Sequence, residues 1–388
     1  MKRLMKITVL AAFFAASLNV LAQTPEPVYS VIRQIRDFDW YEQQAKAWKH
    51  EIDNGTTNPK AWVYWYQANR MAANFCGERE KFNSKTGDYF VSSNDIILKS
   101  AEKHIPNTIE YYYIKTNDSN GTPEEQKEDL IKAQKIKPFD KLMLPILLCD
   151  FVKENDKANI RLTCQKWFES NEMPQELLIT MYNMLISLEQ NAILLVNGDN
   201  DTFPCWVLQE AKNIRPDVLI VNISFAQGKK YRENIFKEND IKPFVYENDS
   251  LAYITAPQLI EHLIANKGNR PLYVSQYVGS DVYKKYEDNM YFTGLALKYS
   301  PKPFNNLAVL RDNVENKFLL DFLKEDFQTT YAQSVVDIMK ASYLSSFQQL
   351  YNYYKQTGEK DKAKKIKELS VTIAENTNKT EWLDYFDK

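Results

Sequence analysis

Two aspartates, Asp199 and Asp201, lie two positions apart in the segment NGDNDTFP, residues 197–204, directly after the aliphatic run Ile193 to Val196. Carboxylates at this spacing after a buried strand could hold a divalent cation, or could supply a nucleophile and a proton-transferring group. A divalent cation, with these two aspartates as its ligands, is the one cofactor that the segment suggests.

The same segment also has the composition of a helix start. Asp201 or Thr202 could cap a helix that begins near Pro204. Gly198 suits a turn with positive φ, and the side chain of Asn200 could bond its own backbone. This structural interpretation leaves only the first aspartate without a role, so both interpretations stay open.

Two enzyme patterns place aspartates comparably. Phosphatases of the haloacid-dehalogenase type carry DxDxT after a hydrophobic strand, and residues 199–202 are similar, with Asp281 or Asp288 as further metal ligands. Metal-dependent nucleotide-sugar transferases use a DxD motif to hold a cation against a diphosphate. Neither pattern is complete. For the phosphatase, Asn197 and Gly198 separate Asp199 from the strand end, and no downstream lysine and paired-acid motif follows. For the transferase, no glycine-rich phosphate loop supports nucleotide binding. A Ser/His/Asp hydrolase is not indicated either, since His262 has no accompanying GxSxG elbow.

Short aliphatic runs flanked by turn residues predict the strands that position these side chains. Residues 193–196 and 218–223 are such runs, with a helical pattern between them. Residues 270–277 and 290–300 predict a third and a fourth strand. Continuous hydrophobicity is typical of parallel strands covered on both faces, so we expect a small Rossmann-like α/β domain.

Polar residues follow each of the first three predicted strands. Ligands bind at this edge in open parallel sheets, because the carboxyl ends of the strands meet there. The resulting ligand-binding candidates are Asn197, Gly198, Asp199, Asn200, Asp201, Thr202, Asn222, Ser224 and Ser275. Side chains that could add stacking or polar contacts to a sugar, or could instead belong to the core, are Trp206, Arg215, Tyr273 and Tyr277.

The regions before and after this domain have apolar residues at helical spacing. Helix starts are marked at Pro59, Pro123 and Pro174. Residues 130–170 resemble tetratricopeptide (TPR) repeats, and residues 346–370 resemble them more strongly.

Particular small and helix-breaking residues carry this likeness. Ala133 and Pro138 occupy the small-residue and helix-ending positions of the first stretch. In the second, Gly358 lies between two amphipathic helices and Ala363 occupies the close-packed position. We therefore expect an α+β protein in which TPR-like helical hairpins flank the α/β domain. The expected divisions are residues 1–22, 23–190, 191–305 and 306–388.

Residues 1–22 have the pattern of a cleaved secretory signal, with three basic residues before an apolar stretch. A Gram-negative periplasm is the expected location. Removing the signal leaves 46 of the 49 basic residues against 51 acidic ones, a formal charge of −5, which does not favour nucleic-acid binding. No later apolar run approaches the roughly 20 residues of a membrane span, so an integral membrane protein is not expected.

The chain has four cysteines, none in a CxxC pair: Cys76, Cys149, Cys164 and Cys205. Cys149 and Cys164 could form a disulfide across a helical hairpin in an oxidising compartment, and unpaired thiols are the equal alternative. No histidine lies near a cysteine pair, so a zinc site is not predicted.

Residues 192–369 resemble the soluble C-terminal part of Bacteroidota membrane proteins that belong to the protein O-mannosyltransferase-like glycosyltransferases of the GT-C type. The likeness rests on NGDNDTFPCWVLQEAKNIRPDVLIVNISF, followed by RPLYVSQYV, MYFTGLALKYSP and YLSSFQQLYNYYKQTGEKDKAKKI. Cys205 and Val207 depart from it, where leucine and an aromatic residue are usual. The membrane part assigned to sugar transfer is missing, so the resemblance implies a periplasmic accessory domain without the transferase activity.

Two functions follow from these observations. The first is a periplasmic binding or adaptor protein of the cell envelope, accessory to protein or surface glycosylation. Its helical repeats would bind an envelope protein or peptide, and its α/β edge would hold a glycan. The second is a metal-dependent hydrolase or transferase that uses Asp199 and Asp201.

Overall fold

The computed structural model describes residues 25–75, 93–117, 121–245, 253–325 and 332–387. The chain forms two compact units, one comprising residues 1–29 and 36–133 and the other residues 30–35 and 134–388. The predicted boundaries near residues 190 and 305 stay predictions. Within the described ranges, no helix is both long enough and apolar enough to cross a membrane.

The first unit is helical. Its helices begin where polar side chains accept hydrogen bonds from the free backbone N–H groups of the first turn. Asp37 accepts the N–H of Trp40 at 2.8 Å, and Thr122 exchanges hydrogen bonds with Glu125 in a capping box. The helices are α2 (Phe38–Asp53), α3 (Lys60–Phe75), α6 (Ser93–His104), α7 (Ile109–Asn117) and α8 (Pro123–Ile136), whose last residues belong to the second unit.

The second unit contains a five-stranded sheet and the helices that cover it. Before the sheet come α9 (Leu144–Glu154), α10 (Lys157–Glu169) and α11 (Gln175–Ser187). The helix starts predicted at Pro59, Pro123 and Pro174 are confirmed, since α3, α8 and α11 begin at or one residue after these prolines. The sheet strands are β1 (Ile193–Val196), β2 (Leu219–Asn222), β3 (Leu272–Ser275), β4 (Met290–Phe292) and β5 (Ala296–Tyr299).

The strand order is β2-β1-β3-β5-β4, and β1 pairs in parallel with both β2 and β3. The predicted single fourth strand was wrong. Residues 290–299 form a hairpin, and β5 runs antiparallel to both β3 and β4. Gly294 explains the difference, because its φ of +133° lets the chain turn between the two strands. The sheet is therefore parallel only across β2, β1 and β3.

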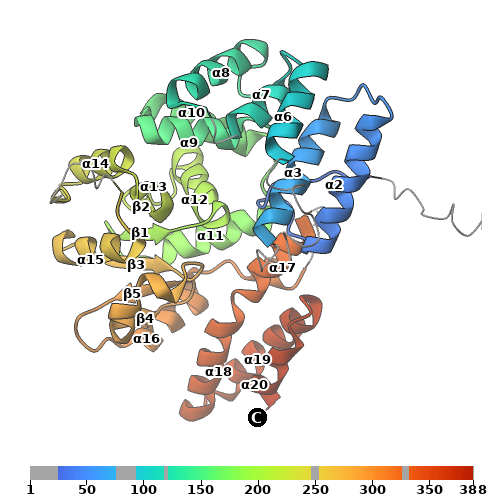
Figure 1. Cartoon of the computed structure of the whole chain (residues 1–388). Coiled ribbons are helices and arrows are strands. Elements are labelled where there is room, and N and C mark those ends of the chain that lie inside the picture. The colour runs from blue at the N-terminus through green and yellow to red at the C-terminus, as the bar shows by residue number, and fades with distance from the viewer. Residues whose placement is uncertain (1–24, 76–92, 118–120, 246–252, 326–331, 388) are drawn as a thin grey trace, which may run out of the picture. The chain divides into compact units, whose positions relative to one another are not determined.

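Alternating side chains of the parallel strands enter two separate cores. Leu194 and Val196 pack with residues of α11 and α12 (Asp199–Lys212), whereas Ile193 and Leu195 pack with α14 (Lys229–Glu238) and α15 (Ala256–Asn266). Figure 1 shows the sheet between these two groups of helices. Each fully buried aliphatic side chain contributes about 1.5–3 kcal/mol. The expected covering of both faces is confirmed.

Strand β2 is at the edge of the sheet. Side chains form hydrogen bonds with backbone groups just before the strand and at its last residue. The amide of Gln209 donates to the carbonyl of Val218 at 2.8 Å, and the N–H of Asn222 donates to the hydroxyl of Tyr231 at 3.4 Å.

After the sheet, the chain is again mainly helical. Gly358 lies between α18 (Leu344–Thr357) and α19 (Lys360–Asn376), as predicted. Its left-handed φ of +76° ends the first of these helices. Ala363 is buried in this hairpin. Whether the helical regions are true TPR repeats stays a prediction. The main helices of this part are α16 (Asn306–Asp312), α17 (Gln333–Ala341), α18 (Leu344–Thr357), α19 (Lys360–Asn376) and α20 (Leu383–Asp387).

The thiols of Cys164 and Cys205 are free and fully buried. A disulfide between Cys149 and Cys164 is therefore absent, and Cys76 lies outside the described residues. Burial raises the pKa of both buried thiols, which keeps them in the protonated, unreactive form.

Candidate functional site

Helix α12 starts at Asp199, five residues earlier than the predicted start near Pro204, and Gly198 is its N-cap. Gly198 has a φ of −103°, so the positive φ expected there was wrong. Asp201 is the third residue of the helix and its carboxylate reaches back to backbone N–H groups that precede the helix. This contact satisfies donors at the helix start, and it explains why the helix can begin before the proline.

The carboxylate of Asp201 is enclosed by donors. Its Oδ1 accepts the N–H of Gly198 at 2.8 Å, its Oδ2 accepts the N–H of Asn197 at 3.3 Å, and the hydroxyl of Ser275 also bonds to it. Only 1% of Asp201 is exposed. Burial raises the pKa of Asp201 to about 6, against the opposing effect of these hydrogen bonds.

A second set of contacts joins the end of β2 to α12. The amide of Asn222 donates to the hydroxyl of Thr202 at 2.9 Å, and its oxygen accepts the N–H of Phe225 at 2.9 Å. The hydroxyl of Ser224 donates to the side-chain oxygen of Asn197 at 3.1 Å. The carboxyl ends of β1, β2 and β3 are thus linked through side chains that the sequence had singled out.

We call Asp201, Thr202, Asn222 and Ser275 the strand-end cluster. All four are buried, and their polar groups bond to one another or to nearby backbone. The other five candidates surround this cluster, and all but the half-buried Asn200 are exposed: Asn197, Gly198, Asp199, Asn200 and Ser224. The side chain of Asn200 donates to the carbonyl of Val31 at 3.0 Å, not to its own backbone as expected.

This geometry does not fit the metal-dependent chemistry suggested by the two aspartates. A cation or a nucleophilic reaction would need both carboxylates to face a substrate, but Asp201 is buried and bonded, whereas Asp199 is exposed. Among the described residues, no group of three or more histidine, cysteine, aspartate or glutamate side chains could hold a metal ion. No catalytic step is derived from these residues.

Three of the four side chains proposed for sugar contacts have structural roles. The guanidinium of Arg215 bonds to Asp217 and to the carbonyls of Leu185, Leu188 and Glu189, each at 2.8 Å. The side chains of Tyr273 and Tyr277 are among the packed residues, and burial raises the pKa of each. Trp206 also belongs to the core, with 7% of it exposed, but it borders a pocket as well.

This pocket, which we call the edge pocket, has a volume of about 300 Å³ and lies beside β2 towards its amino end. Polar side chains line most of it. They come from the start of α10 and the residues before it, from α12, and from α14. The side chains that these three helices and the residues before α10 contribute include Asn155, Lys157, Trp206, Gln209, Glu210, Asn234 and Glu238.

Two charged side chains of the edge pocket, Lys157 and Glu238, pair with each other. Lys157 donates to Glu238 at 2.8 Å, and Asn155 also donates to that carboxylate. Burial alone would raise the pKa of Glu238, but these hydrogen bonds outweigh it, so the pKa lies below its usual value. Except for Trp206, the sequence did not indicate these residues, because they come from separate helices and form no motif.

Residues 179–256 match the family model of TMEM260-associated domain 2, a family linked to O-mannosyltransferase-like proteins. The matched segment contains α12, β2 and α14, and every strand-end candidate except Ser275. No curated protein and no solved structure matches the chain. The family match is consistent with the resemblance to O-mannosyltransferase-like proteins seen in the sequence.

Proposed function

We propose that this protein is a binding module of a glycosylation system and that the edge pocket holds a saccharide. One observation carries the proposal. The pocket is polar, and its walls on α12, β2 and α14 come from the segment that matches a family linked to O-mannosyltransferase-like proteins.

The chemistry of the lining supports a saccharide. Sugar hydroxyls need donors and acceptors together, and the amide of Asn234 and the carboxylate of Glu210 supply both within one pocket. Trp206 adds an apolar wall that suits the C–H face of a sugar ring. Ligand pockets range from roughly 300 to 1,000 Å³, so a pocket of about 300 Å³ suits one or two sugar units.

The strand-end cluster has a positioning role in this proposal. It fixes the start of α12 against the ends of β2 and β3. Glu210 and Trp206 lie further along the same helix, so their positions depend on it.

Saccharide titration followed by nuclear magnetic resonance tests the proposal. Methyl α-mannoside and a mannobiose are the probes, because the matched family is linked to mannosyl transfer. Asn234→Ala should weaken binding about tenfold, the effect of losing roughly one hydrogen bond of 1–1.5 kcal/mol. Lys237→Ala is the matched control, because Lys237 is exposed on the same helix and does not line the pocket.

The control should bind the sugars as the unaltered protein does. If neither sugar binds, or if Asn234→Ala binds them equally well, the edge pocket is not a mannoside site. The proposal is supported if Asn234→Ala weakens binding of the sugars and leaves the thermal unfolding temperature of the protein unchanged.

We further propose that the protein is exported to the periplasm and that its helical regions bind an envelope protein or peptide. The pattern of residues 1–22 supports export, and the two flanking helical regions support an adaptor role. Cell fractionation and intact mass test the first part, since a mature protein that keeps residues 1–22 contradicts it. Affinity purification from envelope extract, with the isolated cytoplasm as control, tests the second.

A further inference from the structure

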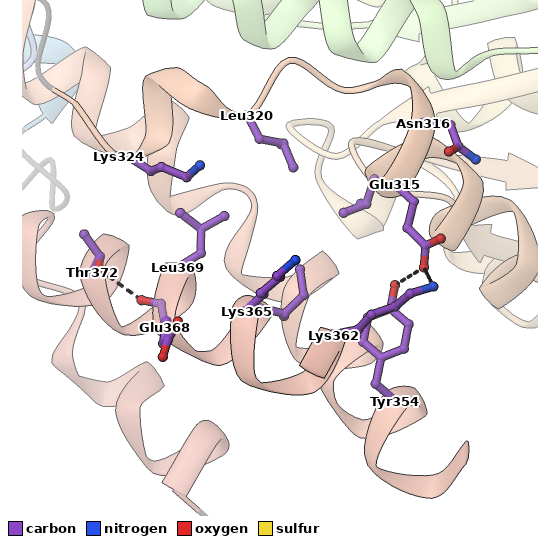
Figure 2. Close-up of a pocket in the computed structure, with 12 residues that line it drawn as sticks. Glu315, Asn316, Leu320, Lys324, Tyr354, Lys362, Lys365, Glu368, Leu369 and Thr372 are labelled. Atoms are coloured by element: carbon purple, nitrogen blue, oxygen red, sulfur yellow. Dashed lines mark hydrogen bonds and ion pairs between the residues drawn. The ribbon is translucent and has the colours of Figure 1, made fainter. Parts of the chain in front are cut away.

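A second pocket lies in the C-terminal part of the second unit. It has a volume of about 770 Å³ and is bounded by residues 314–324 and by helices α18 and α19 (Figure 2). The segment 314–324 contains a π-helical turn, η3 (Asn313–Lys317), and a 3-10 turn, η4 (Asp321–Leu323). We call this the lysine pocket, because Lys324, Lys362 and Lys365 line it.

One end of the lysine pocket is charge-balanced. The carboxylate of Glu315 accepts hydrogen bonds from Arg311 at 2.8 Å, from Lys362 at 2.9 Å and from the hydroxyl of Tyr354 at 2.6 Å. Arg311 and Lys362 also pair with Glu359. Figure 2 shows Lys362 directed to Glu315. Lys362 is therefore occupied and contributes little free positive charge.

The other end carries two lysines and, among the residues that the structure describes there, the carboxylate of Glu368. Lys365 has no ion pair within the described parts of the chain, and it is exposed. Lys324 lies 3.4 Å from Asp321, whose side chain is fully exposed, so this surface pair is weak. The carboxylate of Glu368 lies 3.8 Å from Lys364, and both side chains are exposed, so this surface pair is weak as well. Two lysines therefore face one carboxylate at this end of the pocket.

Apolar side chains lie between these lysines. Figure 2 shows Leu320 and Leu369 facing the space into which Lys324 and Lys365 also point. Ile366 lines the same wall. Water in contact with these side chains is released when an apolar group replaces it, so an alkyl chain is favoured there. The pocket thus combines an apolar surface with unbalanced positive charge.

We infer that the lysine pocket binds a single-chain amphiphile whose head group is anionic. The head would lie between the ammonium groups of Lys324 and Lys365, and the alkyl chain would contact Leu320, Leu369 and Ile366. This ligand class differs from the saccharide proposed for the edge pocket, and the inference does not depend on that proposal.

Isothermal titration with decanoate tests the inference, with decanol and inorganic phosphate as the two partial ligands. Decanoate should bind more tightly than either, because only decanoate has both the charge and the chain. The double variant Lys324→Ala/Lys365→Ala should weaken decanoate binding about tenfold, as expected for two ion pairs of roughly 0.5–1 kcal/mol each. Added salt should weaken the binding as well.

Lys360→Ala is the matched control, since Lys360 is exposed on the same helix but does not line the pocket. It should leave the affinity unchanged. The inference is overturned if decanol or phosphate binds as tightly as decanoate, or if the double variant binds decanoate normally. Because all three lysines are on the surface, circular dichroism should show that each variant is folded.

Discussion

Replacing Asp201 by asparagine should remove a specific pH dependence of stability. In the folded protein this carboxyl group is 1% exposed, and burial raises its pKa from 3.8 to about 6. In the unfolded chain it ionises near its ordinary pKa. At a pH between these two pKa values, the carboxyl group is protonated in the folded protein and ionised in the unfolded chain. The contribution of this group to the free energy of unfolding therefore falls as the pH rises through this window.

The size of the effect follows from the pKa shift. A change from 3.8 to about 6 corresponds to about 3 kcal/mol, which is fully present below the unfolded pKa and lost by neutral pH. Other carboxylates act in the opposite direction. Asp217, for example, has its pKa lowered to about 2 by its hydrogen bonds with Arg215, so its contribution is lost as the pH falls. The contributions of these other groups to the free energy of unfolding cancel when two proteins that differ only at Asp201 are compared.

Urea denaturation at a series of pH values between about 4 and 7 measures the difference. The stability of the unaltered protein relative to Asp201→Asn should fall by about 2.4 kcal/mol across this range, because part of the effect is already lost at pH 4, just above the unfolded pKa. Ser275→Ala should shift the fall to higher pH, because the hydroxyl of Ser275 stabilises the ionised carboxylate. Asp199→Asn, which removes an exposed charge from the same helix start, should leave the fall in place. A constant difference at every pH would refute the burial of Asp201.

Three further outcomes are expected. Arg215→Ala should lower the free energy of unfolding by about 2–3 kcal/mol in chemical denaturation, because it leaves three carbonyls and Asp217 without their donor, and Arg215→Lys should restore only part of this. Gly358→Ala should cost only about 1 kcal/mol in the same assay, since φ is +76° but nothing lies within 4 Å of an added Cβ; a loss several times larger would contradict that open space. Iodoacetamide should modify Cys164 and Cys205 only after unfolding, as peptide mass mapping can show, and rapid labelling of the native protein would contradict their burial.

The parts of the fold that could be predicted depend on local patterns. Strands β1, β2 and β3 could be predicted because each is a short continuous apolar run, and the meeting of their polar ends follows from parallel pairing. The early start of α12 could not be predicted, because it depends on Asp201 reaching back to Gly198 and Asn197. The hairpin at Gly294 could not be distinguished from a single strand, because one glycine inside an apolar run is also compatible with a bulge or a continuous strand.

The two pockets show a limit of another kind. The edge pocket joins side chains from α10, α12 and α14, and the lysine pocket joins a lysine after η4 to one on α19. None of these residues has a distinctive spacing in the sequence. Their proximity results only from tertiary packing, so composition and periodicity carry no signal for it.

Residues 30–35 belong to the second unit although they interrupt the sequence of the first, and this arrangement affects the order of folding. Ile32 belongs to the core of the second unit, and the N–H of Ile35 bonds to the hydroxyl of Ser334 at 2.9 Å across 299 positions of the chain. Closing so long a loop is entropically costly. During synthesis the first unit can fold as soon as it emerges, whereas the second must wait for nearly the entire polypeptide. A chain cut short near its C-terminus should consequently leave Ile32 exposed to proteases.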